Sequence, residues 1–215
     1  MTLLVRAIVR ASDLDRVATD DDIVAIRAAD LAALASRIDG PVSATESALR
    51  GHDSLTRSIH ERVASLPARF GQLFESEDDV VAAIEARAAT LREGIATVDG
   101  RVEVAITLRW RELSRPSASV DGSPGHAYMA QRAADLALAR RAEAIAARLV
   151  DEMAYERAHA RLKTCPRPGV AAIVAILVDR DDVSDVRERV RSFGACSSEV
   201  TASVDGVFAP YSFAS

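Results

Sequence analysis

Two histidines that each precede a carboxylate are the residues whose types could bind a metal ion. His52 is followed by Asp53, and His60 is followed by Glu61. The two histidines are eight residues apart on one expected helix, which separates them by about 12 Å along the helix axis. A zinc ion holds its nitrogen ligands at roughly 2.1 Å. The spacing therefore predicts a polar helix edge and no metal site.

An arginine and a glutamate in the first half of the chain could form a charged pair. Arg69 and Glu103 each fall on an expected strand. They could form a cross-strand ion pair, or Arg69 could bind an anion. Neither a glycine-rich nest nor a second basic residue lies beside Arg69 in the sequence. We therefore expect the ion pair, and we expect it to stabilise the first domain.

The end of the chain concentrates aromatic residues. Phe208, Tyr211 and Phe213 fall within eight positions of a chain that is only 4% aromatic. An exposed, flexible segment of this kind would present an apolar patch to water. We expect the segment, stiffened by Pro210, to pack on the body of the protein. Contact with a partner protein is the alternative.

Local signatures of catalysis and of cofactor binding are absent. The sequence has no GxGxxG, P-loop, CxxC, HExxH, GxSxG or EF-hand pattern, so we assign no catalytic, metal or cofactor residue. The region from residue 126 to residue 167 carries eight Arg or Lys against five Asp or Glu. A surplus of this size does not make a nucleic-acid surface, which needs clustered basic charge.

Composition is that of an ordinary soluble chain. The protein has 215 residues, is 49% hydrophobic and 27% charged, and has a net charge of -5. That length suits one large or two small domains. The longest purely apolar run, Val170–Val178, is nine residues long, less than half of the roughly 20 needed to cross a bilayer. The first six residues lack the layout of a signal peptide, so we expect a cytoplasmic protein and no membrane contact.

Apolar periodicity predicts the elements of the first half. Residues 31–38 are ambiguous, because alanine and leucine favour helix while the segment is only eight residues long; we prefer a strand. Thr45 and Ser76 are expected helix caps. The expected strands are 3–9, 23–28, 31–38, 67–74 and 102–110, and the expected helices are 45–65 and 76–95.

The second half alternates strands with helices. After a Pro- and Gly-containing loop, the pattern predicts a helix over 126–161, a strand over 170–178, a helix ended by Gly194, and a strand over 200–204. With strand 102–110 in front, this order fits a ferredoxin-like α+β sandwich. We expect domains at 1–111 and 126–206, a linker at 112–125, and a packed tail at 207–215.

Five segments resemble a known family in order along nearly the whole chain. They are Leu66–Gly71, Gly100–Val104, Gly125–Met129, Ala175–Val178 and Pro210–Phe213. This set resembles the gas vesicle accessory proteins of the GvpF/GvpL family. The tail departs from the family's fuller Gly-Pro-Trp-Pro-Pro-Tyr-Ser-Phe form, since Val207, Phe208 and Ala209 replace proline, tryptophan and proline.

The resemblance implies a two-domain α+β protein whose second domain is a modified ferredoxin-like fold with a long helix. It implies a non-enzymatic assembly factor that is associated with the gas vesicle and binds the major hydrophobic shell protein and other accessory proteins. The alternative is a small-molecule-binding regulator or enzyme on a ferredoxin-like fold, which hosts many functions. A polar pocket would favour the alternative, whereas an apolar groove or open sheet edge would favour the assembly factor.

Overall fold

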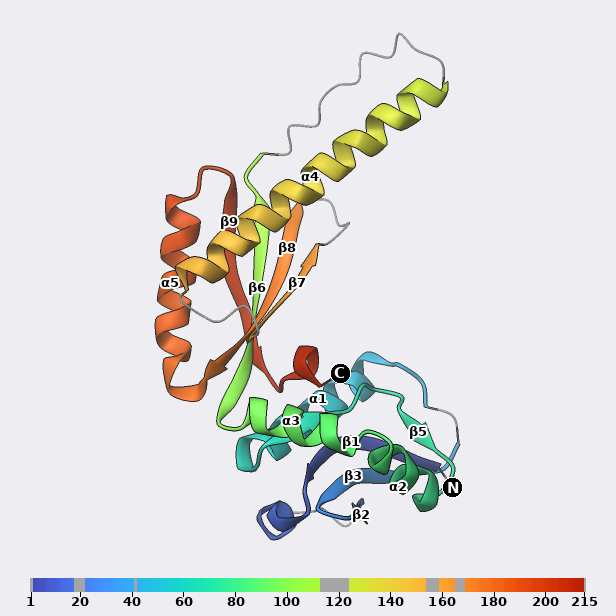
Figure 1. Cartoon of the computed structure of the whole chain (residues 1–215). Helices are drawn as coiled ribbons and strands as arrows, with labels where there is room; N and C mark the ends of the chain where they lie inside the picture. The colour runs from blue at the N-terminus through green and yellow to red at the C-terminus, as the bar shows by residue number, and fades with distance from the viewer. Residues whose placement is uncertain are drawn as a thin grey trace. The chain divides into compact units, whose positions relative to one another are not determined.

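The computed structural model of the chain describes residues 2–17, 22–40, 42–112, 124–153, 159–164 and 169–214 (Figure 1). The chain forms two compact units. Unit 1 is Met1–Glu103 together with Phe208–Ser215, and unit 2 is Val104–Val207. Each unit combines helices with a sheet, which confirms the predicted α+β class.

Unit 1 contains a sheet whose order is β2-β3-β1-β4, with β5 also paired to β1. The three strands predicted before residue 40 are all present. Residues 31–36 of β3 are all buried, which explains how an alanine- and leucine-rich segment forms a central strand. The strands are β1 (Thr2–Arg10), β2 (Ile23–Ala28), β3 (Leu31–Ile38), β4 (Ser65–Pro67) and β5 (Leu73–Phe74).

The strand predicted over 67–74 is wrong as one element. It divides into β4 and β5, because the chain turns at Gly71, whose φ of 86° lies in the left-handed region that glycine tolerates. Both pieces pair with β1 in antiparallel register. The turn leaves Arg69 outside any strand.

Two helices of unit 1, α1 and α2, begin at the expected caps. Thr45 Oγ1 accepts a hydrogen bond from the backbone of Ala48, and Ser76 forms a capping box with Asp79. The helix predicted from Ser76 breaks in two around residues 86 and 87, where Arg87 leaves helical geometry. The helices are η1 (Ala11–Arg16), α1 (Glu46–Arg62), α2 (Glu77–Glu85) and α3 (Ala88–Val98).

Unit 2 is built on a sheet of order β7-β8-β6-β9. Its elements follow one another as strand, helix, strand, strand, helix and strand, which is the ferredoxin-like arrangement. The helices α4 and α5 lie against the sheet in Figure 1 and bury their apolar residues in one core with β6, β8 and β9. The elements are β6 (Arg101–Trp110), α4 (Pro124–Glu152), β7 (Ala160–Thr164), β8 (Val170–Asp179), η3 (Arg180–Asp182), α5 (Val183–Cys196) and β9 (Val200–Phe208).

The long helix predicted to reach residue 161 ends at Glu152. The strand β7 follows, and it pairs with β8 in antiparallel register, with Ala160 opposite Ile176. This edge strand is absent from the sequence prediction. It completes the ferredoxin-like sheet.

The units divide the chain at a different place from the boundary expected at residue 111. Val104, Ile106 and Leu108 of β6 belong to the core of unit 2. Residues 208–215, expected as a separate tail, belong to unit 1. Of the expected linker 112–125, residues 113–123 lie outside the described residues.

One glycine marks a close approach of helix to strand in unit 2. A Cβ atom on Gly194 of α5 would lie 2.8 Å from the backbone nitrogen of Ala202 in β9. Backbone atoms cannot move aside as a flexible side chain can. Gly194 therefore sets how closely α5 packs on the sheet.

Gly194→Ala is expected to lower the free energy of unfolding by about 1–3 kcal/mol, because it overpacks the contact between α5 and β9. The matched control is Gly51→Ala in α1, where a new Cβ meets nothing within 4 Å. That control should raise stability by about 0.5–1 kcal/mol through helix propensity. Urea unfolding of both variants measures the difference, and equal effects would contradict the packing argument.

Candidate functional site

The C-terminal segment lies on unit 1. The chain leaves β9 at Phe208 and ends in the short helix η4 (Tyr211–Phe213). Ala209, Pro210 and Phe213 are buried, and Phe208 and Tyr211 are half-buried. The guanidinium of Arg57 lies 5.8 Å from the centre of the Phe208 ring, a distance suited to a cation–π contact. The aromatic residues singled out in the sequence thus contact unit 1 itself.

A buried carboxylate fastens this segment. Glu103 is only 7% exposed, and its two carboxylate oxygens accept hydrogen bonds from Ser212. The backbone N–H of Ser212 donates over 2.7 Å, and its hydroxyl donates over 2.8 Å. Burial raises the pKa of Glu103, and the two hydrogen bonds from Ser212 oppose that rise. A charged group kept from water in this way depends on its donors.

The predicted ion pair between Arg69 and Glu103 is not formed between these two described residues. Arg69 is exposed and lies after the end of β4, so its charge stays in water and needs no counter-charge. Ser212, and not Arg69, donates hydrogen bonds to the Glu103 carboxylate. Neither charge nor apolar periodicity singles out this serine in the sequence.

A second polar group of unit 1 centres on a histidine. Arg6 donates from Nε to Ser36 Oγ over 3.0 Å and from Nη1 to His52 Nδ1 over 2.9 Å. His52 Nε2 lies 2.9 Å from the carbonyl oxygen of Ala68. Because a guanidinium can only donate, Nδ1 accepts and the ring proton sits on Nε2. This tautomer is the neutral imidazole. Burial, with a contribution from the charge of Arg6, lowers the pKa of His52.

The interpretation of His52 and His60 as a polar helix edge is wrong, since each is only 3% exposed. His60 lies with Nε2 2.6 Å from the carbonyl oxygen of Arg101 and Nδ1 3.2 Å from Ser65 Oγ. Within the described ranges, no group of three His, Cys, Asp or Glu residues is placed to hold a metal ion.

Tyr211 connects the segment to this histidine. Its ring centre lies 6.4 Å from that of His52, which also meets the edge of Phe70 at 5.5 Å. The Tyr211 hydroxyl is buried beside Thr56 but makes no hydrogen bond with a described residue. Burial raises the pKa of Tyr211. We call Arg6, His52, Glu103, Tyr211 and Ser212 the tail cluster.

A small cavity opens elsewhere in unit 1. Its volume is about 90 Å³, and most of its lining is apolar, from β1, β4, α2 and α3, with Ala214 at the end of the chain. Pockets that hold drug-sized ligands measure roughly 300–1,000 Å³. The cavity is therefore suited to a side chain and is too small for a metabolite of that size.

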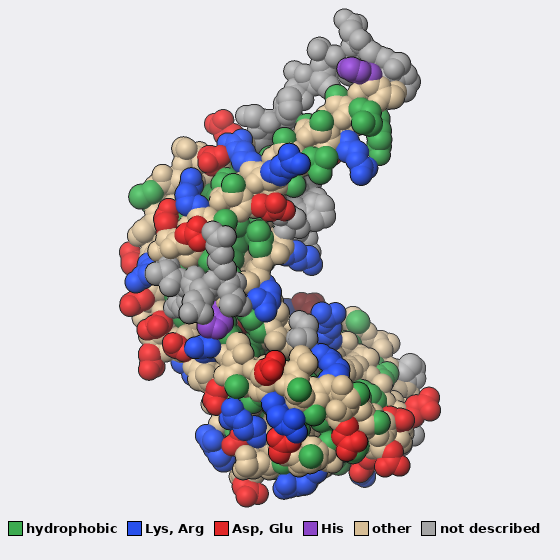
Figure 2. Space-filling model, in the orientation of Figure 1, with side chains coloured by type: hydrophobic (Ala, Val, Ile, Leu, Met, Phe, Trp, Pro, Cys, Tyr) green, Lys and Arg blue, Asp and Glu red, His purple; other side chains and the backbone are tan. Residues whose placement is uncertain are grey.

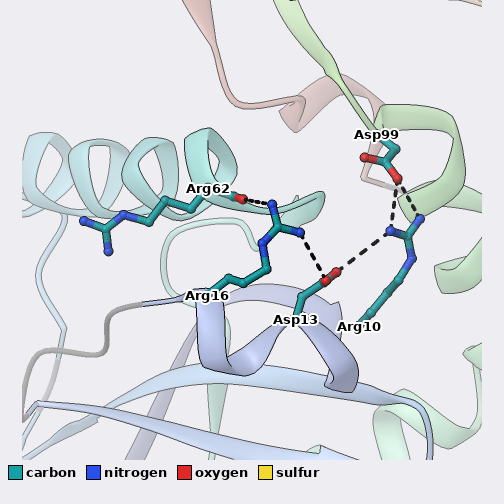
Figure 3. Close-up of polar contacts among 5 residues, drawn as sticks. All are labelled: Arg10, Asp13, Arg16, Arg62 and Asp99. Carbon is teal, nitrogen blue, oxygen red and sulfur yellow. Dashed lines mark hydrogen bonds and ion pairs between the residues drawn. The ribbon is translucent and has the colours of Figure 1, made fainter.

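Surface ion pairs and a hydrogen bond connect η1 to Asp99, which precedes β6, and to the end of α1 (Figure 3). Arg10 contacts Asp99 over 3.0 Å and Asp13 over 3.8 Å. Arg16 contacts Asp13 over 3.5 Å and donates to the carbonyl oxygen of Arg62 at the end of α1. Exposed pairs of this kind contribute at most about 1 kcal/mol each, so we regard the network as structural.

The tail cluster holds a segment of chain, and its imidazole and its carboxylate are both engaged in hydrogen bonds. Both ring nitrogens of His52 are occupied, and both carboxylate oxygens of Glu103 are bound by Ser212. General acid–base catalysis requires a group within reach of a substrate proton. The geometry therefore fits attachment rather than proton transfer.

Comparisons with known proteins point in one direction. The family model described as gas vesicle synthesis protein GvpL/GvpF matches residues 5–215. The crystal structure of gas vesicle protein GvpF from Anabaena sp. PCC7120 is 18% identical, with a TM-score of 0.74 over 100% of this chain and 96% of that one. GvpF from Microcystis aeruginosa is 16% identical, with a TM-score of 0.75 over 100% and 99%. No curated protein sequence matches the chain.

Glu103→Ala is expected to lower the free energy of unfolding by about 1–3 kcal/mol, because the Ser212 N–H loses its buried acceptor. Arg69→Ala is the matched control and should change stability by less than about 0.5 kcal/mol. Guanidinium chloride unfolding of the two variants checks both values. A costly Arg69→Ala beside a harmless Glu103→Ala would restore the ion-pair interpretation.

Protonation of His52 should destabilise unit 1. Its pKa is lowered from 6.5, so its contribution to stability is fully present above pH 6.5 and is lost as pH falls through the lowered folded value. The stability difference between wild type and His52→Gln should therefore shrink between pH 7.5 and pH 5. A difference that stays constant over this pH range, measured by urea unfolding, would contradict the argument.

Proposed function

Because the chain belongs to the GvpL/GvpF family of gas vesicle synthesis proteins, we propose that it is a non-enzymatic assembly factor that binds the hydrophobic shell protein of the gas vesicle. The observation that carries the proposal is the family match over residues 5–215, which includes both units and the C-terminal segment. The proposed role in vesicle synthesis therefore concerns both units of the chain and not one of them alone.

The proposed partner follows from what a gas-filled shell requires. Its subunits need an apolar surface toward the gas, and such a surface associates nonspecifically in water unless another protein covers it. We place the protein in the cytoplasm at the growing vesicle, with other accessory proteins as further partners. Across the described residues, none of the helices combines the length and apolar character needed to cross a membrane.

The competing function is a regulator or enzyme that binds a small molecule. Two features of unit 1 count against it. The His52 imidazole and the Glu103 carboxylate are bound by Arg6, the Ala68 carbonyl and Ser212, and the described cavity of about 90 Å³ has few polar groups. A ligand site normally places several free polar groups around a larger hollow. The assembly role needs neither feature.

Omitting this chain from a host that carries a complete set of gas vesicle genes should reduce the buoyant cell fraction at least tenfold. Re-expression of the wild type should restore buoyancy, because assembly again has its factor. Flotation and electron microscopy measure vesicle yield. Affinity purification of a tagged chain, followed by quantification of co-eluting shell protein, measures binding.

The two readouts separate the candidate functions. Lost vesicles together with co-purified shell protein support the assembly factor. Lost vesicles without any co-purified shell protein favour the regulator or enzyme. Unchanged vesicle yield after omission contradicts the proposed role in synthesis.

A further inference from the structure

The first half of α4 extends beyond the core of its own unit (Figure 1). No residue from 125 to 141 is buried, and the helix contributes to the core of unit 2 only from Ala142 onward. Seventeen residues of helix are about 25 Å long at 1.5 Å per residue. The alanines in this stretch favour helix, but among the described residues the stretch adds nothing to the core of unit 2.

This free half of α4 carries large apolar side chains in water. Seven large hydrophobic residues are exposed in the described structure, and four of them lie within eleven residues here: Tyr128 (61%), Met129 (63%), Leu136 (55%) and Leu138 (38%). Single exposed apolar residues are ordinary, whereas a cluster marks an interaction surface. Tyr128 and Met129 also belong to the Gly125–Met129 segment that carries the family resemblance, and neither is part of the described core of unit 2.

Three of the free positions form one stripe. Met129, Ala133 and Leu136 recur at steps of four and three, so they share a face of the helix. The residues that pack on the sheet lie on a different face, roughly 150° around the axis at 100° per residue; they are Ala142, Ile145, Ala146, Leu149 and Met153. Leu138 falls on the sheet-facing side. The stripe therefore points away from the sheet that the rest of α4 covers.

The charge of the free half is opposite to that of the whole protein. Residues 125–141 contain Arg132, Arg140 and Arg141 against Asp135, a net charge of +2, whereas the chain carries -5. Figure 2 shows green and blue side chains along this part of the helix. Arg141 is bound to Glu199, but Arg140, which continues the stripe, makes no ion pair with a described residue.

We propose that the stripe of Met129, Ala133, Leu136 and Arg140 docks a helical segment of the shell protein whose apolar face is flanked by carboxylates. Apolar steps of three and four suit an amphipathic helix laid along the stripe, and Arg140 on the stripe and Arg132 beside it attract carboxylates. A second copy of this chain is disfavoured as the occupant, because its own stripe brings the same arginines against these two. The proposal rests on the proposed function, of which it names the binding surface.

The test compares polar variants of two sides of one helix. Met129→Gln with Leu136→Gln removes the stripe, and glutamine preserves helix propensity. Leu138→Gln is the matched control on the other side. Circular dichroism confirms that both variants keep their helix. Shell protein co-purified with the tagged full chain should fall at least tenfold for the stripe variant and less than twofold for the control.

A second arm uses two synthetic 18-residue helical peptides that share one leucine and alanine face and differ in flanking charge. By fluorescence anisotropy, the wild type should bind the glutamate-flanked peptide at least tenfold more tightly than the lysine-flanked one. Arg132→Gln with Arg140→Gln should remove most of that preference. Raising the salt concentration should weaken binding of the glutamate-flanked peptide.

Unchanged shell-protein capture by the stripe variant would overturn the proposed surface while leaving the assembly role intact. Failure of the wild type to capture shell protein would count against the assembly role, and the peptide arm then decides whether the stripe binds such helices. Equal binding of both peptides overturns the proposed charge of the occupant. Dimers that light scattering detects for the wild type but not for the stripe variant would assign the stripe to a second copy.

Discussion

Two hydrogen bonds from Ser212 to the buried carboxylate of Glu103 join the two stretches of chain that form unit 1. Unit 2 lies between these stretches in the sequence, as an insertion. A carboxylate held from water at 7% exposure needs those donors. These bonds hold η4, which carries Tyr211 and Phe213, against β4. They also place the Tyr211 ring beside the neutral His52 of α1, in addition to Phe70. The order of the whole C-terminal segment depends on this contact.

Local rules predicted much of the fold. The alternation over β6 and the Thr45 and Ser76 caps each act within a few residues, and each of these elements is present. The edge strand β7 was missed because its five residues follow an alanine-rich helix without a turn signal, and only pairing with β8 identifies it. The family resemblance, in contrast, is carried by segments spread along the chain, so it survived these local errors.

The tail cluster was beyond local rules because its members lie far apart in sequence. Arg69 and Glu103 were paired by charge and expected strand position, the two signals that a sequence offers. The actual donor is a serine 109 positions after Glu103. In α4, apolar periodicity identified a helix but not its contacts. Leu136 and Ala142 lie on different faces of the helix. The sheet covers the face that carries Ala142 and leaves the face that carries Leu136 exposed.

The insertion has a consequence in time. A chain is synthesised from its N-terminus at roughly 5–20 residues per second, so residues 104–207 take about 5–20 s to follow Glu103 from the ribosome. Throughout that interval the nascent unit 1 has its five strands and its histidine but lacks Ser212. Its Glu103 carboxylate lacks both of its hydrogen-bond donors, and the surface of unit 1 that Phe213 later buries remains in water. Unit 1 is therefore completed only after all of unit 2 has been synthesised, and a chain interrupted before Ser212 leaves the Glu103 carboxylate without these two hydrogen-bond donors.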